Sequence, residues 1–154
     1  MLRLALAWIH LLALGIGLAA VWGRASALSG ASDASQLKRA FTADAWWGLA
    51  AGLWLITGLW RLAAGTEKDT GYYMSNHVFF AKMGLFLLVF ALEIYPMVTL
   101  IRWRGMMRRD GSSLDMTALR ASAARISTIS YVQCLLVVAM VLAAAAMARG
   151  YGAT

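Results

Sequence analysis

Two side chains that can do chemistry lie inside apolar stretches of the sequence, where polar groups are costly. His10 stands about two helical turns into the run 4–22, and Lys82 stands about one turn into the run 79–101. A neutral imidazole at such a position can ligate haem or another metal, relay a proton, or donate a hydrogen bond to a neighbouring helix. From the residue alone, each of these roles is open for His10.

Further basic groups fall close to these two side chains. Arg61 closes the apolar run 45–62, and His77 stands just before the run 79–101. Helices that cross a membrane back and forth bring one set of residues into the same half of the bilayer. That set is His10, Arg61, Lys68, His77 and Lys82. A haem needs an axial ligand such as His for its iron and favours Arg or Lys beside its propionates, so the set suits a haem.

The pattern therefore predicts a haem site. His10 is the expected axial ligand of the metal, Arg61 and Lys82 are the expected partners of the propionates, and His77 is a candidate second ligand. The sequence has no C-x-x-C-H motif, so the haem would be held non-covalently as haem b. In the competing interpretation, Arg61 and Lys82 keep their stems in lipid and extend their charges to the interface, and His77 is solvated.

Glu93 is the only acidic residue well inside an apolar run. It follows Lys82 by eleven residues, or ~16 Å along a helix, so the two side chains cannot form an ion pair. Glu93 is expected to be protonated, to contact polar side chains of the last apolar run, or to belong to a proton path. Those polar side chains are Ser127, Ser130 and Gln133.

Four apolar runs, 4–22, 45–62, 79–101 and 126–147, must position these residues. Each is close to the ~20 residues with which an α-helix crosses ~30 Å of hydrocarbon. The chain is 62% hydrophobic and only 14% charged, which is typical of membrane proteins and not of soluble domains. The sequence predicts an all-α integral membrane protein, a single domain (1–154) folded as an antiparallel four-helix bundle, with helices at about 3–23, 35–64, 76–104 and 114–148.

The first run also resembles a secretory signal, because Ala25-Ser26-Ala27 imitates a cleavage site. However, the run is longer than the ~7–15 apolar residues of a signal and carries Trp8 and His10 in its first half. We expect a first membrane helix that is retained.

The net charge of +7 favours anionic lipid headgroups as the partner and not nucleic acid, because the basic residues flank apolar runs without forming a separate basic domain. Lys and Arg are more frequent in the segments 24–39 and 102–125 than on the opposite side. The positive-inside rule then predicts a multi-pass protein of the bacterial inner membrane with both termini in the periplasm. Trp residues near those segments are expected to anchor at headgroup depth; they are Trp22, Trp46, Trp47 and Trp103.

Several short motifs resemble an uncharacterised family of small bacterial four-helix membrane proteins, over nearly the whole chain. The motifs are Asp44-Ala-Trp-Trp-Gly48, Gly71-Tyr72-Tyr73 and Tyr95-Pro96. His77 and Glu93 depart from that family's pattern. More distantly, His10 and the Phe79-x-x-Lys82 motif look similar to J-type protoporphyrinogen oxidases and to the membrane part of copper-resistance D-type proteins. The former resemblance implies haem b binding through His10 and a functional Lys82.

The leading hypothesis is a b-type haem-binding membrane protein that acts in electron transfer or tetrapyrrole oxidation; whether it is an enzyme is open. The alternative is a non-enzymatic accessory subunit that docks in a larger respiratory or photosynthetic membrane complex. A weaker third hypothesis is an ion-coupled transporter that uses Glu93.

Overall fold

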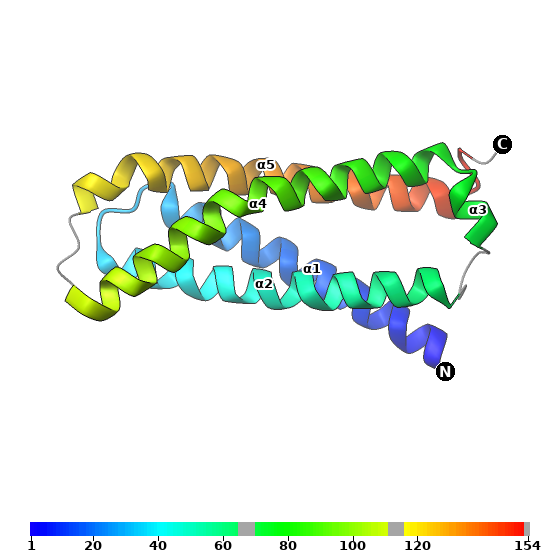
Figure 1. Ribbon diagram of the computed structural model, residues 1–154, viewed down its shortest axis with the longest axis horizontal. Helices are drawn as coiled ribbons and strands as arrows, with labels where there is room; N and C mark the ends of the chain where they lie inside the picture. The colour runs from blue at the N-terminus through cyan, green and yellow to red at the C-terminus, as the bar shows by residue number, and fades with distance from the viewer. Residues whose placement is uncertain (65–69, 111–115, 153–154) are drawn as a thin grey trace.

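The computed structural model describes residues 1–64, 70–110 and 116–152, and these residues contain helices but no β-strand. Four long helices lie alongside one another (Figure 1). They are α1 (Leu2–Leu28), α2 (Ala34–Ala63), α4 (His77–Asp110) and α5 (Met116–Ala148). The short helix α3 (Thr70–Met74) lies at the end of the molecule where both termini are found. The all-α prediction is confirmed.

Two helices extend past the ends that the apolar runs predict. α1 continues to Leu28 instead of about residue 23, and α4 continues to Asp110 instead of about residue 104. The extension of α1 is buried, because Ala27 and Leu28 belong to an apolar cluster that also contains Trp103 and Ile126. Packing between helices determines these ends, whereas the length of a bilayer crossing does not.

Three of the long helices are long and apolar enough to cross a membrane by length and composition: Leu2–Leu28, His77–Arg109 and Thr117–Ala148. The corresponding part of α2 is long enough, but it is less hydropathic because its apolar run contains four Trp residues, several glycines and Arg61. These Trp residues are Trp46, Trp47, Trp54 and Trp60. The structure thus supports three of the four expected membrane spans.

The first turn of α2 is capped by Asp33. Its carboxylate accepts hydrogen bonds from the backbone N–H groups of Ser35 (2.7 Å) and Gln36 (3.0 Å). A bond from the Ser35 hydroxyl, followed by these backbone bonds, lowers the pKa of Asp33. The cap fixes where α2 begins after the link from α1.

The helices do not contact one another equally. α1 packs against α2 and α5, and α4 packs against α5, whereas α2 and α4 have little contact. A close approach of α1 and α2 is possible because Gly17 has no side chain. A Cβ added there would meet the Ala50 Cβ and the Trp47 ring at 3.4 Å.

Two apolar clusters form the core, and we call them the end cluster and the middle cluster. The end cluster contains Ala27, Leu28, Ala31, Leu37, Ala40, Leu100, Trp103, Ala123 and Ile126. The middle cluster contains Ala20, Val21, Trp47, Val89, Cys134, Val137 and Met140. Trp47 and Trp103 are 7% and 4% exposed, so the expectation that they anchor in the headgroups was wrong; they fill the core. Trp22 and Trp46 are exposed.

Candidate functional site

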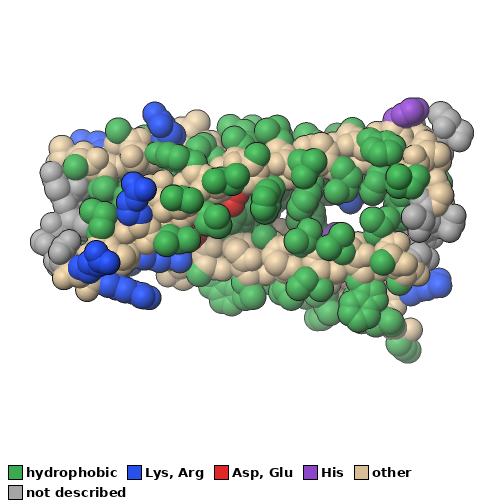
Figure 2. All heavy atoms as spheres, in the orientation of Figure 1, with side chains coloured by type: hydrophobic (Ala, Val, Ile, Leu, Met, Phe, Trp, Pro, Cys, Tyr) green, Lys and Arg blue, Asp and Glu red, His purple; other side chains and the backbone are tan. Residues whose placement is uncertain are grey.

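A cavity of about 550 Å³ lies in the half of the molecule that contains α3. Its walls come from all five helices, and His10, Arg61 and Lys82 are among the lining residues. Figure 2 shows an opening between α2 and α4 in this half, with Lys or Arg atoms and His atoms visible inside it. The structure therefore brings together three of the residues that the sequence singled out for haem binding. Lys68 lies outside the described residues.

His10 is held in one orientation by α2. Its Nδ1 is 2.8 Å from the hydroxyl oxygen of Thr57, and that hydroxyl is 2.7 Å from the carbonyl oxygen of Leu53. Because the Thr57 hydroxyl donates its proton to the carbonyl, it accepts a hydrogen bond from His10. The hydrogen-bond network thus assigns the proton of a neutral imidazole to Nδ1 and the lone pair to Nε2. Gly58 makes room for the ring, since a Cβ there would lie 3.4 Å from His10 Cε1.

Aromatic rings form much of the cavity wall. The Trp54 ring is 5.6 Å from the His10 ring and 6.2 Å from the Phe86 ring, between centroids. Tyr73 and Phe79 are paired at 5.3 Å nearer α3. Trp54 Nε1 is buried and has no hydrogen-bond acceptor among the described residues, which is a cost that folded proteins usually avoid. Such walls favour a flat, largely apolar ligand.

The two cations of the cavity come from different helices. Arg61 lies in the last turn of α2, where a positive charge is also favoured by the helix dipole, and Lys82 lies in the second turn of α4. Both side chains are partly exposed. They suit a ligand with anionic groups, although the dipole and snorkelling account for part of their placement.

His77 does not line the cavity. It is exposed at the first position of α4, and its backbone N–H donates to the carbonyl of Gly152. α4 begins there because the side-chain oxygen of Asn76 accepts hydrogen bonds from the N–H groups of Val78 and Phe79. This position does not support His77 as a second ligand beside His10.

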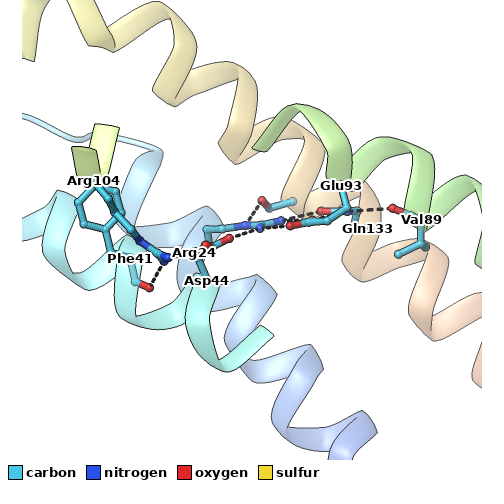
Figure 3. Close-up of polar contacts among 8 residues, drawn as sticks. Arg24, Phe41, Asp44, Val89, Glu93, Arg104 and Gln133 are labelled. Carbon is cyan, nitrogen blue, oxygen red and sulfur yellow. Dashed lines mark hydrogen bonds and ion pairs between the residues drawn. The ribbon is translucent and has the colours of Figure 1, made fainter. Parts of the chain in front are cut away.

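A second polar site lies in the other half of the molecule and centres on Arg24, which is completely buried (Figure 3). Its Nε donates to Ser130 (3.0 Å), Nη1 donates to Asp44 (2.8 Å) and Glu93 (2.7 Å), and Nη2 donates to Glu93 (2.8 Å) and Gln133 (2.9 Å). These five bonds occupy all five N–H donors of the guanidinium group.

Further bonds extend this site across α2, α4 and α5. Arg104 donates to the other oxygen of Asp44 (2.8 Å) and to the carbonyl of Phe41 (2.7 Å). The amide of Gln133 donates to Glu93 (2.9 Å) and to the carbonyl of Val89 (3.2 Å). We call the set of Arg24, Asp44, Glu93, Arg104, Ser130 and Gln133 the Arg24 cluster. With both acids ionised its two cations and two anions balance, which a site of low dielectric requires.

The described residues contain no group of three or more His, Cys, Asp or Glu side chains arranged to hold a metal ion. The two acids of the Arg24 cluster are already neutralised by arginine, and Cys134 is buried in the middle cluster.

Residues 2–152 match the model of a family described as predicted membrane protein, DUF2214. The chain belongs to this family. No curated protein and no solved structure matches it. Membership confirms the resemblance to an uncharacterised membrane family and supports a location in a membrane. The more distant similarity of this DUF2214 protein to J-type protoporphyrinogen oxidases and copper-resistance D-type domains stays a prediction.

The sequence did not predict the Arg24 cluster of the DUF2214 protein. Arg24 was assigned to a cytoplasmic link, but it lies inside α1 because the helix continues through Ala25 to Leu28. Glu93 accepts a hydrogen bond from Gln133 on α5, as one interpretation of the sequence expected. Its main partner, however, is Arg24. The small, apolar residues after Arg24 were the available signal, because they allow the helix to continue.

The sequence had indicated that the unusual polar groups gather in one half of the molecule. The structure instead divides them between the two halves. On every long helix, residues of the middle cluster or its apolar neighbours lie between the cavity and the Arg24 cluster. Examples are Val21 on α1, Trp47 on α2, Val89 on α4 and Val137 on α5. The DUF2214 protein has two polar sites separated by an apolar layer, which disfavours a proton path from Glu93 to the cavity.

Proposed function

We propose that this DUF2214 protein binds haem b in the cavity, with His10 as an axial ligand of the iron. The observation that carries the proposal is the orientation of His10. Its Nδ1–H is committed to Thr57, so the ring nitrogen that carries the lone pair is Nε2. Haem- and metal-ligating histidines typically have their other N–H held by such a hydrogen bond, which fixes the tautomer and the plane of the ring.

The remainder of the cavity fits the same group. Its volume of about 550 Å³ is within the ~300–1,000 Å³ of typical cofactor sites. Trp54, Phe86 and Tyr73 provide flat apolar walls for a macrocycle. Arg61 and Lys82 provide cations for two propionates, which are carboxylates.

Each residue has a separate task in this proposal. His10 ligates the iron, Thr57 holds His10, Arg61 and Lys82 orient the propionate edge, and the aromatic walls exclude water. When bound, haem b supplies one-electron chemistry whose potential depends on the axial ligand and on burial. Electron transfer and tetrapyrrole oxidation are the two reaction classes that this arrangement serves.

The proposal includes a position in the bacterial inner membrane as an antiparallel four-helix bundle, with α2 as the fourth span. α2 is supported as a span by its close contact with α1 and by the exposed Trp46 and Trp60 near the two ends of its apolar run. Both termini are proposed to be periplasmic. Because Arg24 lies inside α1 and not in the link, that orientation depends on the exposed basic residues. They include Lys38, Arg39, Arg102 and Arg108.

A haem titration in detergent tests the proposed pairing of Arg61 and Lys82 with the haem propionates. Arg61→Gln and Lys82→Gln should each weaken haem binding by about 10- to 100-fold, because a charge-assisted hydrogen bond contributes ~1.5–3 kcal/mol. Haem dimethyl ester, which has no free carboxylates, should bind the wild-type protein and both variants with similar affinity. Arg39→Gln is the matched control, because Arg39 is exposed in the other half of the molecule.

Equal affinities for haem and its dimethyl ester in all four proteins would contradict the roles of Arg61 and Lys82. Absence of any saturable Soret band in the wild-type protein would contradict haem binding itself. Stoichiometric purification with a respiratory or photosynthetic complex, without haem, would instead favour the accessory-subunit alternative.

A further inference from the structure

The sides of the cavity are closed to different degrees. α1 packs against α2 and α5, and α4 packs against α5, so three of the seams between neighbouring helices are filled. α2 and α4 are the neighbours with little contact, and Figure 2 shows the opening between them. This seam connects the cavity with the outer surface of the helices.

At the opposite end of the same seam, hydrogen bonds join α2 to α4. Arg104 of α4 donates to the carbonyl of Phe41 and to Asp44 on α2, and Asp44 is joined through Arg24 to Glu93 on α4 (Figure 3). These bonds hold α2 and α4 together at the Arg24 cluster. The two helices are therefore tied in one half of the molecule and separated around the cavity in the other.

Near α3, hydrogen bonds join the end of α5 and the residues that follow it to α3 and to the start of α4. The Tyr72 hydroxyl donates to the carbonyl of Met147, and the Asn76 amide donates to the carbonyl of Tyr151. The N–H of His77 donates to Gly152, which seats the chain end on the start of α4.

The rim of the opening is apolar. Leu55 and Leu59 of α2 line the cavity and are nevertheless 43% and 57% exposed, so they face both the cavity and the surroundings. On the other side, the partly exposed Met83 and Phe86 of α4 line the same cavity. A partly exposed apolar rim on membrane helices borders acyl chains and not water.

We propose that the opening between α2 and α4 is a lateral portal through which the cavity takes its ligand from the bilayer. The ligand class is a lipid-soluble amphipath with a flat apolar body and anionic groups. Its body passes between the Leu59 and Met83 sides of the rim, and its anionic groups come to rest at Arg61 and Lys82. The identity of that ligand as haem rests on the proposed function, whereas access from the bilayer does not.

Photolabelling from the lipid phase tests the portal with the full-length protein in vesicles. A phospholipid that carries a diazirine on its acyl chain is activated by light, and labelled residues are mapped by mass spectrometry. Met83 and Phe86 should be labelled in the wild-type protein, and Leu59→Trp, which narrows the rim, should remove that label. Leu142, which is 71% exposed on α5, should stay labelled in both proteins.

Ile56→Trp is the matched control, because Ile56 is on the same helix with a similar exposure of 60% but does not line the cavity. It should leave the labels on Met83 and Phe86 intact. Leu55→Trp repeats the test at a second rim position if Leu59→Trp fails to fold. Wild-type protein that is labelled at Leu142 but not at Met83 or Phe86 would overturn the portal.

The portal proposal and the haem proposal can each be contradicted while the other stands. Labelling of the cavity wall in a protein that gives no Soret band supports the portal and contradicts haem as the ligand. If the protein binds haem, but Met83 and Phe86 are never labelled in vesicles prepared without haem, the haem proposal is retained and the lateral portal is overturned.

Discussion

At the scale of single residues, the main cost in this molecule is the burial of Arg24 among membrane helices. An unpaired charge there would be prohibitive, and the chain offsets the cost with two carboxylates, an amide and a hydroxyl drawn from three other helices. An ion pair of this kind contributes less than its short distances suggest, but the loss of one partner leaves a buried charge without compensation.

Removal of Arg24 should therefore be strongly destabilising. Arg24→Gln leaves Glu93 and Asp44 without their shared cation, and we expect a loss of about 3–5 kcal/mol in the free energy of unfolding. Arg24→Met combined with Glu93→Met removes one charge of each sign and keeps the Asp44–Arg104 pair, so it should recover part of that loss. Thermal unfolding in detergent measures both.

Arg39→Gln serves as the control for the Arg24 variants, because Arg39 is exposed and should be nearly neutral. An Arg24→Gln protein as stable as Arg39→Gln would show that the Arg24 cluster does not hold the four helices together.

Thr57 allows the orientation of His10 to be tested without changing the ligand. Thr57→Val keeps the shape of the side chain but removes the hydroxyl that accepts from Nδ1. Haem affinity should fall by about 10- to 100-fold, as is typical when the partner of a ligating histidine is lost. Thr57→Ser, which retains a hydroxyl, should stay close to the wild-type affinity in the same titration. Equal losses in both variants would assign the effect to packing.

The sequence identified His10, Arg61 and Lys82 because a polar group in an apolar run is conspicuous. It did not identify Arg24, because a basic residue at the end of an apolar run is usually a topology signal. In the structure, the packing of Leu28 and its neighbours in the end cluster shows that α1 continues and that Arg24 is inside it.

At the scale of elements, the most demanding contact is the one between the chain end and the start of α4. Gly152 has φ of +81°, and a Cβ there would lie 2.5 Å from Val78 Cγ2 and 2.8 Å from the Asn76 side-chain oxygen. Both the backbone conformation and the space require glycine.

Gly152→Ala should therefore displace the chain end while the helices stay folded. The strain of a left-handed conformation is about 1–2 kcal/mol before the clash is included, and the segment that follows α5 can relieve both by detaching from the start of α4. Amide exchange should become faster at His77, whose N–H donates to Gly152. Gly84→Ala, in an open position on α4, should leave that exchange rate unchanged. An unchanged rate in Gly152→Ala would contradict the described contact.

Each of the four apolar runs lies within one long helix of the structure, because the length of hydrocarbon to be crossed favours helices of about that length. The ends were predicted less well, since Asp33 acts as a local cap that the sequence reveals, whereas the extensions of α1 and α4 depend on packing between helices. Trp47 and Trp103 were misassigned for the same reason: an aromatic residue near a helix end can anchor in lipid or fill the core.

At the scale of the whole molecule, the four long helices hold two polar sites apart with an apolar layer between them. The Arg24 cluster ties all four helices in one half, and the cavity separates α2 from α4 in the other. No pattern in the sequence indicates which helices touch, because the outer faces of membrane helices are as apolar as their contacts. The seam between α2 and α4 emerged only from the arrangement in space.

The central claim is that His10 ligates haem b in the cavity, and the reduced-minus-oxidised absorption spectrum of haem-loaded protein tests it most directly. The wild-type protein and His77→Ala should give the same Soret and visible bands, because His77 lies outside the cavity. His10→Ala, shown to be folded by its elution from size-exclusion chromatography, should lose those bands. A His10→Ala spectrum identical to that of the wild type, or no Soret band in either protein, would contradict the account.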